Sequence, residues 1–474
     1  MQIEWKDINS GNSLNYKVLL SGLLLIIPLL FILNLFSLNT RIVLIVLGLP
    51  LIAIFLFSFK AFKYLFILSL FTNYYLLGLY LTVFIAIGFL FSFLLAHTRF
   101  EYGFFKTPLT FPFLIYFISI LPSFLNSSNV VLSFYNSLNL FGIAILLFVF
   151  GHVINTYQEI NKIILSFIIL CLLDAVVIII YSTIRSGREY GLSGIVFVDY
   201  SAIGILLLLL YIVFQRQANI FLIIGSILIL LSGLIFTQTR NSFISLLLTS
   251  LSIFAYMIFS KNKFHIPKKR IIYVFTTIIL ISLLFIIVLN TLKPEVFQRF
   301  NQLDSTKVLK VKQESDFSGN SILTRLLIWD TAWNAFKAHP IIGIGAYSFP
   351  FESARYYTIP RDLYETFVEG LSPHVTYIAN LAETGILGFV GFIILLVFSL
   401  KTGFSSVKLS VTSEQKFFST ILLTLQIYIF FSMFLTDAWL WGQCGMLWGM
   451  VMGLLIANNK IVKYTNRFNL NAAK

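Results

Sequence analysis

The chain has 474 residues, of which 58% are hydrophobic and only 11% are charged. This composition excludes a soluble globular protein, because repeated apolar runs of about 20 residues match the hydrocarbon core of a bilayer. The net charge of +14 would suit a nucleic-acid-binding protein, but Lys and Arg gather in short connections between the apolar runs, where they set membrane topology. No nucleic-acid partner is therefore expected.

The apolar runs predict helices, since backbone polar groups in lipid must be hydrogen-bonded within their own segment. Strands of a membrane barrel would alternate apolar and polar residues, and these runs do not. Residues 1–16 are polar and contain acids, unlike a signal peptide, so the first helix is expected to stay as an anchor. We predict an all-α polytopic membrane protein with about 12–14 transmembrane helices. The expected spans are residues 17–36, 41–59, 64–76, 77–96, 108–125, 130–150, 161–182, 199–214, 218–236, 241–260, 271–290, 381–400, 416–435 and 440–457. The region 60–96 forms either two crossings or one helix with a re-entrant lead-in.

The strongest basic loop, "KNKFHIPKKR" at residues 261–270, is expected on the cytoplasmic side. Alternation from this loop also places residues 97–106, residues 401–416 and both termini in the cytoplasm. One large extracytoplasmic loop then lies between the spans near 271–290 and 381–400. The chain divides into N-terminal membrane helices (1–182), central membrane helices (183–290), the loop domain (291–380) and C-terminal membrane helices (381–474).

Two arginines fall on the expected outer face, against the usual distribution of positive charge. Arg240 ends the "TQTR" turn between two apolar runs, and Arg188 lies in the short connection "RSGREYGLSG". A guanidinium at a membrane edge is costly unless it is paired or hydrated. It can anchor a helix end by reaching into the headgroup layer, or bind a phosphate or diphosphate through its fork of donors. Both interpretations stay open for each residue.

The loop domain contains a patterned segment, "NSILTRLLIWDTAWNAFKAHPIIGIGAYSF". Ile328, Trp329, Ala332 and Phe336 lie on one stripe at helical spacing. Ser321 or Thr324 is the expected N-cap, and glycines at 343 and 345 predict a turn after the helix. Arg325 then lies in the first turn, where the helix dipole disfavours a cation. Either a bound anion or a salt bridge with Asp330 would explain it.

The stretch "SPHVTYIANLAETG" precedes a further apolar run. Ser372 is a suitable N-cap and proline suits the first helical position, so we expect a helix over 372–400, about 43 Å long. Its first turns would stand outside the hydrocarbon core. His374 would then face an extracytoplasmic cavity as a neutral general base, or serve only as a surface histidine. Tyr377 would share its face. Glu383 lies half a turn round, so we expect it to act structurally, unless Gly385 kinks the helix.

Asp174, Asp199 and Asp437 lie near or within apolar runs, and the sequence does not rank them. The remaining histidines lack metal-ligand spacing, and no nucleotide-binding or zinc pattern is present. Neither a metal nor a cofactor is expected.

Three segments together, "TQTRNSFISL", "TRLLIWDTAWNAFKAHPIIGIGAYSF" and "SPHVTYIANLAETGILGFVGFI", resemble the bacterial O-antigen ligase and O-antigen polymerase superfamily. The resemblance covers residues 185–400. It implies a GT-C-like architecture and a multi-pass, metal-independent glycosyltransferase on the outer face of the cytoplasmic membrane. The implied donor is a glycan linked to undecaprenyl diphosphate. By motif, Arg240 and Arg325 would bind the diphosphate with support from Arg188, and His374 would activate the acceptor hydroxyl. Val375 replaces a small polar residue common at this place in the family.

The acceptor is not fixed by these motifs. A polymerase extends a lipid-linked glycan and can act with a chain-length-regulating partner, whereas a ligase transfers the glycan to lipid A–core. We favour a polymerase because polymerases serve more surface-glycan pathways. A third hypothesis, a transporter or flippase of a lipid-linked substrate, would require symmetric halves with broken helices at mid-membrane, and the sequence has no such symmetry.

Overall fold

The computed structural model describes residues 66–67, 70–71, 106–184, 191–214, 219–260, 264, 266–276, 280, 287, 291, 321–440 and 442–472. Within these ranges the chain is helical and forms no β-strand, so the predicted all-α fold is confirmed there. The predicted spans 17–36, 41–59 and 77–96, and most of 64–76 and 271–290, lie outside the described residues. The elements are α5 (Thr110–Ile120), η1 (Leu121–Asn126), α6 (Val130–Val153), α7 (Tyr157–Ile184), α8 (Phe197–Phe214), α9 (Ile220–Phe236), α10 (Asn241–Phe259), α14 (Ser321–Ala338), α15 (Phe349–Glu352), η3 (Ser353–Arg355), α16 (Arg361–Phe367), α17 (Thr376–Leu409), α18 (Ser413–Ser432), η4 (Ala438–Leu440) and α19 (Gly442–Ala472).

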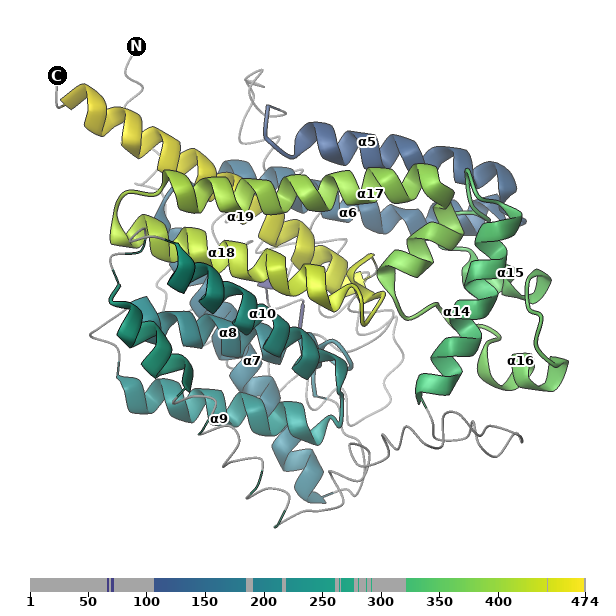
Figure 1. Ribbon diagram of the computed structural model, residues 1–474, viewed down its shortest axis with the longest axis horizontal. Coiled ribbons are helices and arrows are strands. Elements are labelled where there is room, and N and C mark those ends of the chain that lie inside the picture. The colour runs from purple at the N-terminus through teal and green to yellow at the C-terminus, as the bar shows by residue number, and fades with distance from the viewer. Residues whose placement is uncertain are drawn as a thin grey trace, which may run out of the picture.

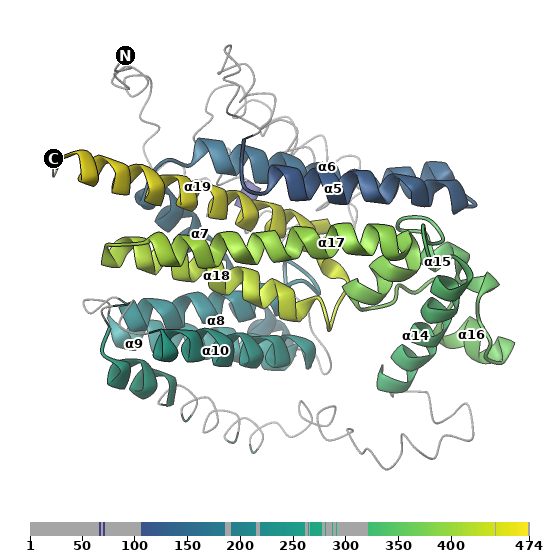
Figure 2. The ribbon, with the colours of Figure 1, turned by 45° about the horizontal axis from the view of Figure 1, so that its top comes forward.

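The long helices form a layered bundle in which most axes run in similar directions (Figure 1). Helices α5 and α6 pack against α17 and α19, and α18 connects this layer to α8 and α10. Helices α7 and α9 pack against each other and against α8. Figure 2 shows α14, α15 and α16 at one end of the bundle, while the C-terminal part of α19 lies at the opposite end. The end that carries α14 is called the loop end below.

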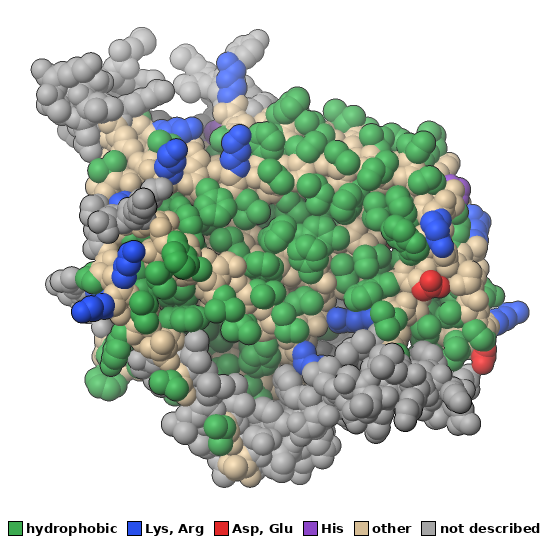
Figure 3. Space-filling model, in the orientation of Figure 1, with side chains coloured by type: hydrophobic (Ala, Val, Ile, Leu, Met, Phe, Trp, Pro, Cys, Tyr) green, Lys and Arg blue, Asp and Glu red, His purple; other side chains and the backbone are tan. Residues whose placement is uncertain are grey.

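Among the described residues, six helices are long and apolar enough to cross a membrane: α6, α7, α8, α10, α17 and α19. The segments 110–126 and 220–236 are shorter apolar helices. Figure 3 shows hydrophobic side chains over the middle of one face, with most Lys and Arg toward its two ends. This distribution is the one that a bilayer imposes, and the protein is a polytopic membrane protein.

Helix α18 corresponds to the predicted span 416–435, but it is not among the six helices that are long and apolar enough to cross a membrane. It is enclosed by α8, α10, α17 and α19, and Lys416, Thr420 and Thr424 on it are buried. The two threonine hydroxyls donate to backbone carbonyls one turn earlier, at 2.6 and 2.7 Å. Because protein surrounds this helix, its polar side chains lie inside the bundle and do not face lipid.

Helices α6 and α19 pack closely through glycines spaced four residues apart on α19. A Cβ at Gly449 would lie 2.7 Å from the carbonyl oxygen of Ile143, and one at Gly453 would lie 2.8 Å from that of Leu146. Small residues at this spacing let two backbones approach, which is the main source of helix–helix packing in a membrane.

A backbone joint holds the end of α14 against α17. The turn after α14 contains Gly343 and Gly345 with positive φ, as predicted, and α17 is kinked at Gly385, whose φ is 63°. Four backbone hydrogen bonds of 2.9–3.1 Å cross between them: Ile344 N to Ala382 O, Gly345 N to Glu383 O, Ile386 N to Pro340 O, and Leu387 N to Ile341 O. The kink frees the donors and acceptors that the turn uses.

Helix α14 also has a core of its own. Ile328 and Ala332 are fully buried against Phe349 and Tyr364, which confirms the predicted stripe. Helix α14 begins at Ser321, so neither Ser321 nor Thr324 precedes it as an N-cap, and Arg325 lies in the second turn, which corrects the prediction. The turn after α14 and this small core together fix the position of Arg325 relative to the bundle.

Candidate active site

Four segments far apart in the sequence meet at the loop end. The side chain of Asn241, the first residue of α10, donates to the carbonyl of Leu435 after α18 (2.8 Å) and accepts from Arg325 Nη1 on α14 (3.4 Å). Thr376, the first residue of α17, donates its N–H and its hydroxyl to the carbonyl of Thr436 (3.2 and 2.7 Å). The start of α10, helix α14, the loop before α17 and the turn after α18 therefore form one site.

Arg325 presents a half-buried guanidinium to this site. Burial lowers the pKa of Arg325, the carboxylate of Asp437 opposes that change, and the cation of Arg240 adds to it. Asp330, the alternative partner considered from the sequence, instead accepts a hydrogen bond from the Thr358 hydroxyl at 3.0 Å. An arginine remains protonated in a protein, so Arg325 places a positive charge at the loop end beside Asn241.

Arg240 ends the turn before α10, and this turn is tightly built. Gln238 has a positive φ of 52°, and the Thr237 hydroxyl donates to the Leu234 carbonyl at 2.6 Å. Arg240 is half-buried and directly precedes Asn241, which contacts Arg325. The guanidinium groups of Arg240 and Arg325 repel each other in this partly buried site. A polyvalent anion bound between them would stabilise both charges.

His374 lies in the loop before α17 and not in its first turn. Helix α17 begins at Thr376 with Val375 as the N-cap, and His374 has a φ of 55°, so the predicted start at Ser372 is wrong. The indole N–H of Trp329 donates to the carbonyl of Pro373 at 2.9 Å, which ties the histidine loop to α14. The strained backbone conformation costs about 1–3 kcal/mol and is held by these tertiary contacts.

Burial is the main cause that lowers the pKa of His374. The charge of Asp437 raises this pKa and the charge of Arg325 lowers it. At neutral pH the imidazole is therefore neutral and able to accept a proton.

Asp437 is the residue that the sequence could not single out. It is only 9% exposed, and among the described residues its Oδ2 atom has no hydrogen-bond donor. Asp174 and Asp199 differ, because each accepts hydrogen bonds from hydroxyl groups: Asp174 from Ser193, and Asp199 from Tyr428 (2.6 Å) and Ser432 (3.0 Å). The charge of Asp437 acts on both Arg325 and His374, so it belongs to the site.

Residues 225–393 match a family model described as O-antigen ligase. This match supports the resemblance to the O-antigen ligase and polymerase superfamily over residues 225–393. No curated protein matches the chain. The matched range holds Arg240, Arg325 and His374, whereas Asp437 lies beyond it. The site therefore lies mostly within the O-antigen ligase domain, and the turn after α18 completes it from outside.

Tyr377 and Glu383 lie within the O-antigen ligase domain but are occupied by the fold. The Tyr377 hydroxyl donates to the carbonyl of Phe430 at 3.2 Å, and its ring packs on Phe434 with centroids 4.2 Å apart. The carboxylate of Glu383 accepts the backbone N–H groups of Tyr347 and Phe349, both at 3.1 Å. These contacts hold α17 to α18 and to the turn that follows α14.

Arg188, the third predicted arginine, lies outside the described residues. In the described part of the chain, no three His, Cys, Asp or Glu side chains are grouped as they would be to hold a metal ion. The groups available for chemistry are thus two guanidinium groups, one neutral imidazole and one carboxylate.

Proposed function

We propose that the protein transfers a glycan from an undecaprenyl-diphosphate-linked donor to an acceptor hydroxyl, as a polymerase of a surface polysaccharide. The match of residues 225–393 to the O-antigen ligase family supports a glycan transferase of the O-antigen ligase and polymerase type. The observation that carries the finer proposal is the meeting of Arg325, the Arg240 turn, His374 and Asp437 at the loop end. The proposed donor bears a diphosphate, which is the anion that two guanidinium groups suit best.

In the proposed reaction, the acceptor oxygen bonds to the anomeric carbon of the donor glycan as the bond from that carbon to the diphosphate oxygen breaks. The diphosphate leaves with the electron pair, and Arg325 and Arg240 stabilise its developing charge. The hydroxyl proton passes to the neutral imidazole of His374. Asp437 then faces an imidazolium, which its carboxylate stabilises. The diphosphate is already a good leaving group, so the step needs no metal.

The same site would serve a ligase, since a ligase uses the same donor and differs in its acceptor. We favour the polymerase, and loss of the gene separates the two. Without a polymerase, cells carry single repeat units on the surface. Without a ligase, complete chains accumulate on the lipid carrier.

We place the site on the extracytoplasmic face of the bacterial cytoplasmic membrane, with both termini in the cytoplasm. The position of α14 and the end of α19 at opposite ends of the bundle supports this orientation (Figure 2). Polyprenyl-linked donors present their glycan on the outer leaflet in this proposal, so donor and site share one compartment.

The test is a transfer assay with the purified protein and a lipid-diphosphate-linked glycan. His374→Ala, Arg325→Ala and Arg240→Ala should each lower the transfer rate by about a hundredfold or more, the usual effect of removing a general base or a charge-stabilising donor. Arg361→Ala is the matched control, because Arg361 is an exposed arginine of the same loop domain that pairs with Glu365. Near-normal transfer by all three site variants would refute the proposed site.

A further inference from the structure

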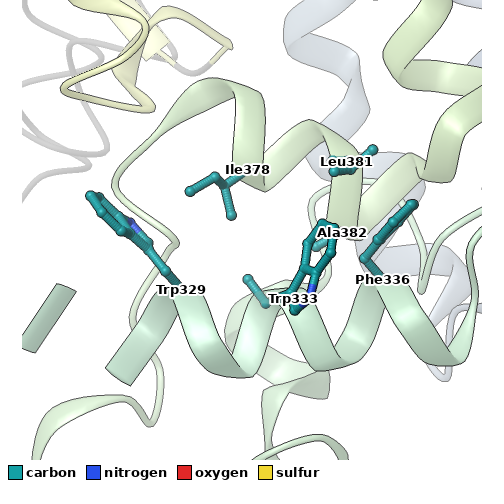
Figure 4. A pocket seen from close by; sticks show the side chains of 7 residues that line it. Trp329, Trp333, Phe336, Ile378, Leu381 and Ala382 are labelled. Carbon is teal, nitrogen blue, oxygen red and sulfur yellow. The ribbon is translucent and has the colours of Figure 1, made fainter. Parts of the chain in front are cut away.

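An apolar pocket of about 230 Å³ lies between α14 and the first turns of α17. Figure 4 shows Trp329, Trp333 and Phe336 on α14 facing Ile378 and Leu381 on α17. Ala332 and Ala382 complete the lining. The small side chains of the two alanines leave the space that the larger ones surround.

The chemistry of the lining indicates a hydrocarbon ligand. All seven lining side chains are aliphatic or aromatic, and the indole nitrogen of Trp329 is engaged by the Pro373 carbonyl. A sugar or a phosphate would need polar partners that this pocket does not offer. Pockets that enclose a whole small ligand measure about 300–1,000 Å³, so this smaller one suits a segment of a single chain.

The pocket begins beside the proposed diphosphate site. Trp329 lines the pocket and also holds the residue before His374. Arg325 lies four residues before Trp329 on α14, about 6 Å along the helix axis. Along one helix, the order is therefore a cation, a tryptophan shared with the histidine loop, and then an apolar cavity that continues to Phe336.

We propose that this pocket takes the first isoprenoid units of the donor's prenyl chain. The inference rests on the proposed function, because the diphosphate at Arg325 fixes where the chain starts. A diphosphate held at the loop end draws the beginning of its chain out of the hydrocarbon layer, and α14 and α17 then shield that part from water. A phospholipid suits the place less well, because it brings two chains and a smaller negative charge.

The test measures binding of two probes to the full-length protein in nanodiscs: undecaprenyl diphosphate, and inorganic pyrophosphate as the head group alone. Trp333→Gln and Leu381→Gln introduce an amide into the pocket from α14 and α17 respectively. Trp333 is 50% exposed, so its replacement leaves the core of α14 intact. Each variant should weaken undecaprenyl diphosphate binding about tenfold, which is about 1.4 kcal/mol, and leave pyrophosphate binding unchanged.

Phe351→Gln is the matched control, since Phe351 is 59% exposed on the same loop domain and does not line the pocket. It should bind both probes like the wild type. Unchanged undecaprenyl diphosphate binding in both pocket variants would overturn the prenyl pocket and leave the proposed function standing, provided that Arg325→Ala weakens both probes. If the wild-type protein binds neither probe, the proposed function itself is refuted.

Discussion

Gly385 is the residue whose replacement tests most sharply how the site is held together. Its φ of 63° and ψ of −168° fall in a region that essentially only glycine adopts. A Cβ there would overlap the carbonyl oxygen of Ile341 and lie 2.6 Å from the nitrogen of Ile342. These are backbone atoms, so no side-chain rotation can relieve the contact in Gly385→Ala.

The expected cost follows from the geometry of the joint. The backbone conformation alone costs about 1–3 kcal/mol for alanine. Separation of the turn from α17 also removes the hydrogen bonds from Ile386 N to Pro340 O and from Leu387 N to Ile341 O, each worth about 1 kcal/mol. Together these effects reach about 3–5 kcal/mol. The joint should therefore open and shift α14, which carries Arg325, relative to His374. A displacement of about 1 Å in an active site can lower a rate about a hundredfold.

Thermal unfolding followed by circular dichroism, together with the transfer assay, measures both effects. Alanine substitutions at two other glycines separate the effect of backbone strain from that of steric overlap. Gly370→Ala places alanine at a φ of 72° in open space, so it should cost strain without overlap. Gly225→Ala lies inside α9 with nothing near its Cβ, and it should be neutral or slightly stabilising. If Gly385→Ala has the same unfolding temperature and the same transfer rate as Gly225→Ala, the joint between α14 and α17 does not position the site.

The acid–base and charge chemistry gives three further predictions. The transfer rate should fall on acidification as His374 gains its proton, with a midpoint below the ordinary histidine pKa of about 6.5. Asp437→Asn should lower this midpoint further, because the substitution removes the charge that raises the pKa of His374. A pH–rate profile of Asp437→Asn that moves to higher pH would contradict this prediction. Arg325→Lys keeps the positive charge but loses the planar guanidinium, so kcat/KM should drop roughly tenfold, about 1.4 kcal/mol. A lysine variant with the full rate would show that Arg325 does not bind the diphosphate through two hydrogen bonds. Transfer should continue after EDTA treatment, whereas a loss that Mg²⁺ restores would show that a metal takes part.

The sequence predicts the membrane helices well wherever apolar runs are long. The spans 130–150 and 161–182 correspond to α6 and α7 within a few residues at each end. This success has a simple cause: lipid permits only helices there, so length and hydropathy suffice. The turn at Gly343 and Gly345 was equally readable, because a positive φ favours glycine.

The start of α17 could not be read from the sequence, although local signals favoured Ser372. Capping chemistry competes with distant contacts, and here the distant contacts prevail. The N–H and hydroxyl of Thr376 bond to the Thr436 carbonyl, 60 residues away, and Trp329 holds Pro373. The sequence could not identify Asp437 as a site residue for a related reason. A structural acid such as Asp199 accepts hydrogen bonds from hydroxyl groups of distant residues, whereas Asp437, within the residues that the structure describes, does not. Such contacts depend on the tertiary structure and leave no local pattern in the sequence.

The central claim is that Arg325, Arg240 and His374 act on one lipid-linked diphosphate. Electron cryomicroscopy of the protein with bound undecaprenyl diphosphate tests this claim most directly. The account predicts the diphosphate against the guanidinium groups of Arg325 and Arg240, with the His374 imidazole facing the side from which an acceptor would approach. A diphosphate bound elsewhere, or a His374 side chain directed away from it, would contradict the account.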